Sequence, residues 1–300
     1  MDKIYTLNTK DYTVSVIDGR TNQVISTIPV GYAPQRIGVN SGTNRIYVTN
    51  LDRTVSVIDG QTDQIIDTIL LPLPPEVTVA VPTGVGINPI TNLIYIANQA
   101  GYNIWVINGH TNTVIDTITT SEYSPSHVAV NPVLNRIYTT NHQSNTVSVI
   151  DGQTNRQINT ISVGELPYGI GVNSATNYIY VANRGTEDVS VINGETDSVV
   201  NTIYVGGAAS EVGVNQSKNR IYVTSPGKGY VFVISGQTHQ VISIIPVGAS
   251  PHGLGVNSIT NKIYTSEYFR NTASVIDGHT NTVDTTISVG DGPSEVGIHL

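Results

Sequence analysis

The chain has 300 residues, 14 of them basic and 22 acidic, and a formal net charge of −8. This charge disfavours binding to nucleic acid, and a chain without cysteine cannot form disulfides, thiolate metal sites or a cysteine nucleophile. Many valine, threonine, asparagine and glycine residues favour strands and tight turns, and no apolar run is long enough to predict membrane insertion.

A phrase related to Val-Ile-Asp-Gly recurs along the whole chain. Its third position falls at Asp18, Asp59, Asn108, Asp151, Asn193, Ser235 and Asp277. Internal repeats of this length, with four short strands in each, are typical of propeller blades. We therefore predict an all-β fold: one seven-bladed β-propeller over residues 1–300, with four antiparallel strands, A to D, in each blade.

The two ends of the chain complement each other. The first predicted strand, residues 3–8, has the pattern of strand B, and two further strands of the same blade follow it. The last predicted strand, residues 293–299, is an isolated strand A. We expect this strand to pair with the N-terminal strands B, C and D and so close the ring without an open edge.

Residues 70–81 interrupt the regular connection between one strand D and the next strand A. The segment reads Leu-Leu-Pro-Leu-Pro-Pro-Glu-Val-Thr-Val-Ala-Val and makes this connection seven residues longer than most. Long loops of this kind can be lids or docking elements. The segment can equally pack back onto its own blade.

A complete unit follows at residues 168–203. Its strands are predicted at 168–173, 178–183, 188–193 and 198–203, from the alternation of apolar and polar residues. The Asn-Gly after the third strand favours a tight hairpin turn. Strand B of this unit, residues 179–183, reads Ile-Tyr-Val-Ala-Asn, and residues 46–50 read Ile-Tyr-Val-Thr-Asn.

Residues 47–50, Tyr-Val-Thr-Asn, match the tetrapeptide that gives the YVTN-repeat β-propellers their name, so the chain resembles that family. The resemblance covers essentially the whole chain. That family includes parts of surface-layer proteins and secreted or periplasmic propellers, so the resemblance implies an extracellular, cell-surface or periplasmic setting. The start, Met-Asp-Lys, does not have the pattern of a signal peptide.

The two faces of the predicted ring differ in sequence. The A–B and C–D turns are near copies of one another, whereas the D–A and B–C loops vary from blade to blade. Divergence can be free drift, but loops on a rigid scaffold commonly carry function. We predict a non-catalytic, monomeric propeller that holds a protein, peptide or glycan on this variable face and requires no cofactor. The candidate binding residues are Arg36, His127, Tyr168, Glu211, Tyr230, Tyr268 and Arg270.

A second hypothesis concerns the mouth of the central channel. Strand A lines the channel, so residues that follow its leading proline belong there; the ends of strand B are predicted at the same rim. These positions supply His252, Glu267 and Glu295. Histidine and carboxylates can bind a divalent cation or act as general acid and base. Alternatively, they form a polar channel mouth in which Arg36 pairs with a glutamate.

Two segments add a weaker resemblance. Residues 251–254, Pro-His-Gly-Leu, and 265–268, Thr-Ser-Glu-Tyr, are similar to segments of streptogramin lyases, which are seven-bladed, magnesium-dependent enzymes. The resemblance implies that His252 is an acid or base, that Glu267 is a metal-associated carboxylate, and that His252 and Glu267 hold a cation such as Mg²⁺. The alternative function is thus a metal-assisted lyase or hydrolase, with Glu295 as a further catalytic residue.

Overall fold

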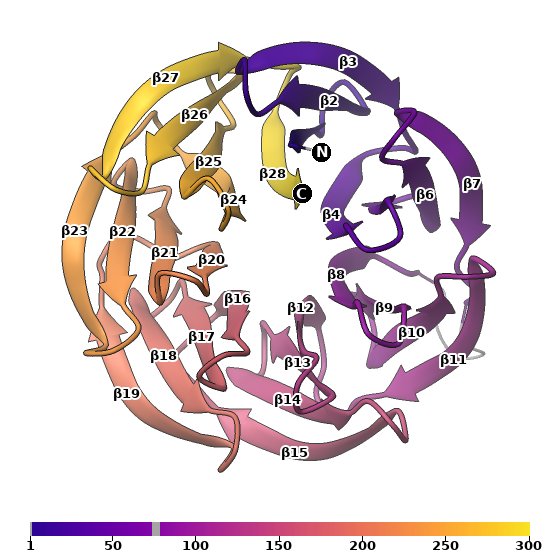
Figure 1. Ribbon diagram of the computed structural model, residues 1–300. Helices are drawn as coiled ribbons and strands as arrows, with labels where there is room; N and C mark the ends of the chain where they lie inside the picture. Colours follow the sequence, from indigo (N-terminus) through magenta and orange to yellow (C-terminus); the bar gives the residue numbers. More distant parts are fainter. Residues whose placement is uncertain (1, 74–78) are drawn as a thin grey trace.

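The computed structural model describes residues 2–73 and 79–300 and shows seven four-stranded antiparallel sheets arranged in a ring (Figure 1). The prediction of an all-β, seven-bladed propeller is confirmed. Among these residues no helix is long and apolar enough to cross a membrane.

The four strands of each blade run from the channel to the outer rim. Strand A is β4 (Pro34–Asn40), β8 (Pro82–Asn88), β12 (Pro125–Asn131), β16 (Pro167–Asn173), β20 (Val212–Asn215), β24 (Pro251–Asn257) or β28 (Pro293–His299). Strand B is β1 (Lys3–Asn8), β5 (Arg45–Asn50), β9 (Leu93–Asn98), β13 (Arg136–Asn141), β17 (Tyr178–Asn183), β21 (Arg220–Ser225) or β25 (Lys262–Glu267). Strand C is β2 (Thr13–Asp18), β6 (Thr54–Asp59), β10 (Asn103–Asn108), β14 (Thr146–Asp151), β18 (Asp188–Asn193), β22 (Tyr230–Ser235) or β26 (Thr272–Asp277). Strand D is β3 (Gln23–Pro29), β7 (Gln64–Leu70), β11 (Thr113–Thr119), β15 (Arg156–Ser162), β19 (Ser198–Tyr204), β23 (Gln240–Pro246) or β27 (Thr282–Ser288).

The ring closes as expected from the two chain ends. Strand β28 pairs antiparallel with β1, from Lys3 opposite His299 to Asn8 opposite Pro293. Figure 1 shows both termini at the inner side of the same blade. The closing blade therefore has its strands in the order β28-β1-β2-β3.

The core lies between neighbouring blades. Strands B and C are almost wholly buried and supply the tyrosines and β-branched residues that pack across each blade interface. In one such cluster, Tyr47 of β5 packs with Ile94 and Ile96 of β9 and with Trp105 of β10. Because each cluster joins two blades, burial of apolar surface stabilises the ring as a whole.

Asparagines connect the blades on the uniform face. The asparagine that ends strand A donates a hydrogen bond to the left-handed residue of the next A–B turn, as from Asn40 Nδ2 to Asn92 Oδ1 at 2.8 Å. Four further asparagine pairs repeat this contact: Asn88–Asn135, Asn131–Asn177, Asn173–Asn219 and Asn215–Asn261. At the closing blade Asn257 donates to Asp2, which precedes β1. The seventh blade has His299 at this position.

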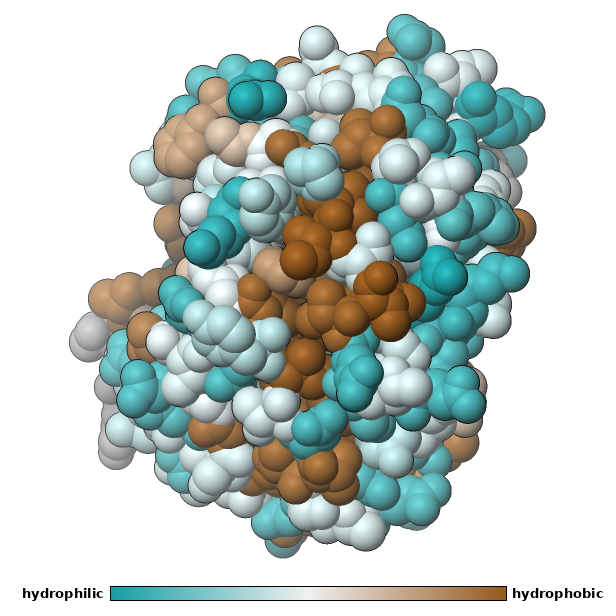
Figure 2. All heavy atoms as spheres, turned by 90° about the vertical axis from the view of Figure 1, so that its left-hand side faces the viewer, coloured by the Kyte–Doolittle hydropathy of each residue, from teal (hydrophilic) through white to brown (hydrophobic). Residues whose placement is uncertain are grey.

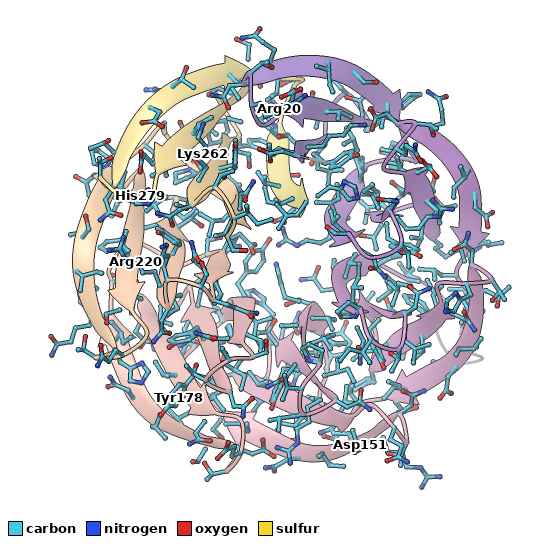
Figure 3. The ribbon with its side chains drawn as sticks, in the orientation of Figure 1. Arg20, Asp151, Tyr178, Arg220, Lys262 and His279 are labelled. Atoms are coloured by element: carbon cyan, nitrogen blue, oxygen red, sulfur yellow. The ribbon has the colours of Figure 1, made fainter. Side chains whose placement is uncertain are left out.

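In three blades the first residue of strand B, which is Lys3, Arg136 or Arg220, also bonds to a neighbouring blade on that face. Arg136 donates to the carbonyl of Gly194 and to Asp197 at 2.8 Å, and Arg220 donates to the carbonyl of Gly278 at 2.6 Å. In Figure 3, Tyr178, Arg220 and Lys262, each the first residue of a strand B, follow one another around the ring. These repeated contacts give the uniform face a structural role.

The ends of the long D–A connection pack against the ring. Leu71 and Ala80 are buried in the cluster that contains Trp105, whose indole nitrogen donates to the carbonyl of Pro72 at 3.1 Å. Leu70 and Val79 are exposed. The middle of the predicted insertion, residues 74–78, lies outside the described residues.

Candidate functional site

The channel is filled at one end by side chains from the second position after the residue that leads strand A. Around the ring these positions are occupied by Arg36, Gly84, His127, Gly169, Glu211, Gly253 and Glu295. Three glycines thus alternate with larger, mostly charged residues. All four larger residues are buried, with exposed fractions between 7% and 9%.

Each glycine allows the next strand A to approach closely. A Cβ atom at Gly84 would lie 2.5 Å from the carbonyl oxygen of Ser126 and 2.7 Å from the Cα atom of His127. Gly169 stands in the same relation to Glu211, and Gly253 to Glu295. The channel is therefore narrow at this level, and its remaining space suffices for four long side chains.

Arg36 crosses the channel and contacts two carboxylates. Its guanidinium lies 2.9 Å from Glu211 Oε1 and also pairs with Glu295 Oε1. Glu211 Oε1 lies 3.1 Å from Nε2 of His127. One buried guanidinium, two carboxylates and one imidazole thus form a continuous polar cluster, which we call the channel cluster.

Burial and mutual contacts shift the pKa values within the channel cluster. Burial acts to raise the pKa of Glu211, but the charge of Arg36 and then His127 lower it to about 2. Burial, followed by the charge of Arg36, lowers the pKa of His127 to about 4. Burial raises the pKa of Glu295 well above its ordinary value, although Arg36 acts in the opposite direction. At neutral pH the cluster therefore contains an Arg36–Glu211 ion pair and a neutral imidazole.

A pocket of about 190 Å³ lies above the channel cluster on the variable face. Its lining combines the cluster with the first position after the strand-A leader and with nearby loops: Thr9, Pro34, Gln35, Arg36, Thr83, Gln99, Ser126, His127, Tyr168, Glu211, His252, Tyr268 and Ser294. The lining therefore comes from residues 9 to 294 and exists only in the closed ring.

Aromatic and cationic groups shape the pocket wall. The ring of Tyr168 lies 4.2 Å from that of His127, and the guanidinium of Arg184 lies 3.2 Å from the Tyr168 centroid. Arg184 also donates to Ser210 Oγ at 2.7 Å. His252 lies beside Tyr268, with 5.3 Å between the ring centroids, and burial lowers its pKa.

The structure brings most of the sequence-predicted residues to this one place. Arg36, His127, Tyr168, Glu211, His252 and Tyr268 line the pocket, and Glu295 contacts Arg36 beneath it. Tyr230 and Arg270 belong to the same loop face but are outside the pocket lining: Tyr230 begins β22, and Arg270 follows β25. The expected pairing of Arg36 with a glutamate is present, with two glutamates as partners.

Glu267 does not reach the channel mouth, contrary to the expectation for the ends of strand B. It is fully buried within its own blade, where Thr265 and Thr272 donate to its carboxylate at 2.7 and 2.9 Å. Burial raises its pKa. In three other blades, those of Asn8, Asn141 and Asn183, the asparagine at this position donates to the side chains five and seven residues later, as Asn8 does to Thr13 and Ser15. Glu267 is the equivalent group in its hairpin.

The proposed cation pair of His252 and Glu267 therefore does not fit. Nε2 of His252 lies 3.1 Å from Ser250 Oγ, and the two residues line different cavities. Over residues 2–73 and 79–300 no group of three or more histidine, aspartate or glutamate side chains could hold a metal ion. The assignment of catalysis to His252, Glu267 and Glu295 stays a prediction, which rests on the resemblance for His252 and Glu267 and on its position in strand A for Glu295.

Several pocket residues were not among the sequence-based candidates. Thr9, Gln99 and Ser294 line the pocket, as does Thr83, whose buried hydroxyl has no hydrogen-bond partner in the part of the chain that the structure describes. Thr83 and Ser294 could have been predicted from their position, because each directly follows the leading proline of a strand A. Thr9 and Gln99 each follow the asparagine that ends a strand B.

Comparisons with known proteins define the fold and no family. No family model and no curated protein matches the sequence. Among solved structures, the fold is similar to hydrazine synthase of Kuenenia stuttgartiensis (18% identity, 90% of each chain covered, TM-score 0.80). It is also similar to the dihydro-heme d1 dehydrogenase NirN in complex with DHE (12% identity, 98% and 74% covered, TM-score 0.73). A protein of unknown function from Desulfotomaculum acetoxidans has 15% identity, with 100% and 99% covered and a TM-score of 0.81. At these identities the likeness concerns the fold alone.

Proposed function

We propose that this chain is a non-catalytic binding propeller that holds a protein, peptide or glycan on the face formed by the D–A and B–C loops. The observation that carries the proposal is the pocket at the channel mouth, which the channel cluster closes from below. Ligand sites are usually concave, largely pre-formed pockets in which aromatic surface is combined with a few placed polar groups. The pocket lies at the centre of the loops that differ most among the blades.

Exposed aromatic side chains around the pocket support the same function. Phe269 and Tyr102 are 73% and 51% exposed, and both belong to B–C loops. Tyr102 packs against Tyr123 of the neighbouring D–A loop, with the rings tilted by 55° and their centroids 5.1 Å apart. Aromatic residues and arginine are enriched among residues that dominate binding energy. With its YVTN-like strands, the protein is proposed to act as a monomer outside the cytoplasm or at the cell surface.

The test is binding of the 300-residue protein to an array of synthetic peptides and glycans. We expect at least one class to bind, and the triple variant Tyr230→Ala, Tyr268→Ala, Arg270→Ala to lose at least tenfold in affinity. The control changes three exposed C–D turn residues on the uniform face, Gln61, Gln153 and Gln237, to alanine, and it should bind as wild type does. A blank array, or equal binding by the triple variant, contradicts the proposal.

A further inference from the structure

The pocket ends blindly, so it can take only a single chemical unit. Arg36 extends from the start of β4 to Glu211, which immediately precedes β20 on another side of the ring. Arg36 and Glu211, both in the pocket lining, form the pocket floor, and Glu295 contacts Arg36 beneath it. A ligand that enters from the loop face must therefore end there, as a free small molecule or as the terminal unit of a chain.

The charge balance of the pocket favours a neutral ligand. The guanidinium of Arg36 already has carboxylate partners in Glu211 and Glu295. His127 and His252 have lowered pKa values because both are buried, so both imidazoles are uncharged at neutral pH. The other nearby guanidinium, that of Arg184, stacks on Tyr168, donates to Ser210 and is not part of the lining. A charged ligand group would therefore lose hydration without meeting a lining group of opposite charge. A peptide terminus, which is charged, is thus a poor match.

The remaining lining consists of neutral hydrogen-bonding groups. Thr9, Gln35, Thr83, Gln99, Ser126 and Ser294 contribute hydroxyl and amide groups. Thr9 bonds to Ser294, Ser126 to Thr140 and Gln35 to the Ala33 carbonyl, but a hydroxyl or amide group can make more than one hydrogen bond. The Thr83 hydroxyl is buried and has no partner among the described residues. An unpartnered buried hydroxyl is unfavourable, so a ligand that hydrogen-bonds to Thr83 would remove this cost. These neutral donors and acceptors favour a ligand that carries several hydroxyl groups.

The size and walls of the pocket agree with this chemistry. The volume of about 190 Å³ is far larger than the roughly 10–15 Å³ of such space that a single water needs, so the pocket has room for a ring-sized group. Tyr168 and Tyr268 supply aromatic surface for the C–H groups of such a ring. We propose that the pocket binds the terminal, uncharged sugar unit of a glycan, an inference that rests on the proposed binding function.

The test is titration of the 300-residue protein with methyl glycosides of glucose, galactose and mannose, with binding monitored by ligand-observed NMR. We expect at least one glycoside to bind, and the corresponding glucuronide to bind more weakly than the glucoside. Thr83→Val removes the hydroxyl while keeping the shape of the side chain, and it should weaken binding by about three- to tenfold. Thr111→Val, in an exposed turn on the uniform face, is the matched control and should leave binding unchanged.

The outcomes separate this inference from the proposed function. If no glycoside binds, if the glucuronide binds as well as the glucoside, or if Thr83→Val has no effect, the sugar assignment is wrong. When the array still shows peptide binding that the triple variant loses, the proposed function survives that result. A blank array together with no glycoside binding contradicts both.

Discussion

Arg36 is the residue on which the channel cluster depends. It is 9% exposed and pairs with Glu211 and Glu295, and the two carboxylates together raise its pKa although burial acts to lower it. Replacing one member of a buried ion pair leaves the other members without compensation. Loss of Arg36 would therefore destabilise the protein chiefly because Glu211 and Glu295 would stay buried without a cationic partner.

We predict that Arg36→Met destabilises the protein by about 3–5 kcal/mol at pH 7. Without the guanidinium, burial raises the pKa values of Glu211 and Glu295 above those of the unfolded chain. The folded variant then binds more protons than the unfolded chain, so lowering the pH from 7 to 4.5 should reduce its deficit relative to wild type. Urea denaturation of both proteins across this range measures the effect.

Arg45→Met is the matched control because Arg45 belongs to the same blade and pairs with Asp59 at 2.6 Å nearer the surface. Its loss should cost less than about 1 kcal/mol. An Arg36→Met variant that is no less stable than Arg45→Met, or whose deficit grows as the pH falls, contradicts the prediction.

The sequence predicted the members of the channel cluster and the pairing of Arg36 with a glutamate, but not which glutamates are the partners. Arg36, His127, Glu211 and Glu295 share one offset in strand A, and a common offset places side chains at one level of the channel. The expectation that Glu267 reaches the channel mouth was wrong. The alternation of side chains along strand B directs this residue into the hairpin of its own blade. The sequence does indicate this, because Thr272 follows Glu267 by five residues, as Thr13 follows Asn8. Distances across the ring, such as that from Arg36 to Glu211, depend on blade packing, which no local pattern encodes.

At the scale of elements, a strand A with a glycine at the level of the channel cluster packs against a strand A that carries a large residue there. Gly84 of β8 contacts the backbone that contains His127, and Gly253 of β24 contacts that of Glu295. Each glycine thus allows a neighbouring strand to approach and bring a large residue into the channel. The pocket floor depends on this alternation as much as on the charges.

We predict that Gly84→Ala destabilises the protein by about 1–3 kcal/mol, because its Cβ atom would overlap the backbone of Ser126 and His127. The β8–β12 contact would have to open, and any ligand affinity of the pocket should fall with it. Thermal denaturation and the glycoside titration measure both effects. In the control Gly42→Ala the nearest atom is a side-chain oxygen 3.4 Å away, so that variant should stay within about 0.5 kcal/mol of wild type. Equal stability of the two variants would show that β8 and β12 adjust freely.

At the scale of the whole molecule, the rim presents seven strand edges. Figure 2 shows apolar side chains gathered on the side of the ring that carries β19, β23 and β27; Val200 and Ile242 are among the exposed residues there. Every C–D pair contains a register shift, as between Val191 and Ile192 of β18. Bulged edge strands resist pairing with further strands, so these register shifts act against edge-to-edge association of the outer strands.

The closing blade is the place where the inter-blade asparagine contact is missing. His299 occupies the position of Asn257 in the preceding blade and is fully buried, and neither ring nitrogen has a hydrogen-bond partner among the described residues. Asn44, which is left-handed at φ 54° like Asn92, lies in the turn that would accept a bond from this position; the amide of Leu300 already contacts Ser41 of that turn. Burial lowers the pKa of His299.

We predict that His299→Asn completes the seventh inter-blade contact and stabilises the protein by about 1–3 kcal/mol at pH 7, because it removes an unpartnered buried group and adds a hydrogen bond. The pKa of His299 is lower in the folded than in the unfolded chain, so wild type loses stability from this group as the pH falls below about 6.5. The gain from the substitution should therefore be larger at pH 5.5 than at pH 7.5. Urea denaturation at both values tests this, with His110→Asn in an exposed turn as the control that should change nothing. A destabilised His299→Asn variant, or an equal gain at both pH values, would mean that the imidazole has a role in closing the ring that an asparagine side chain cannot perform.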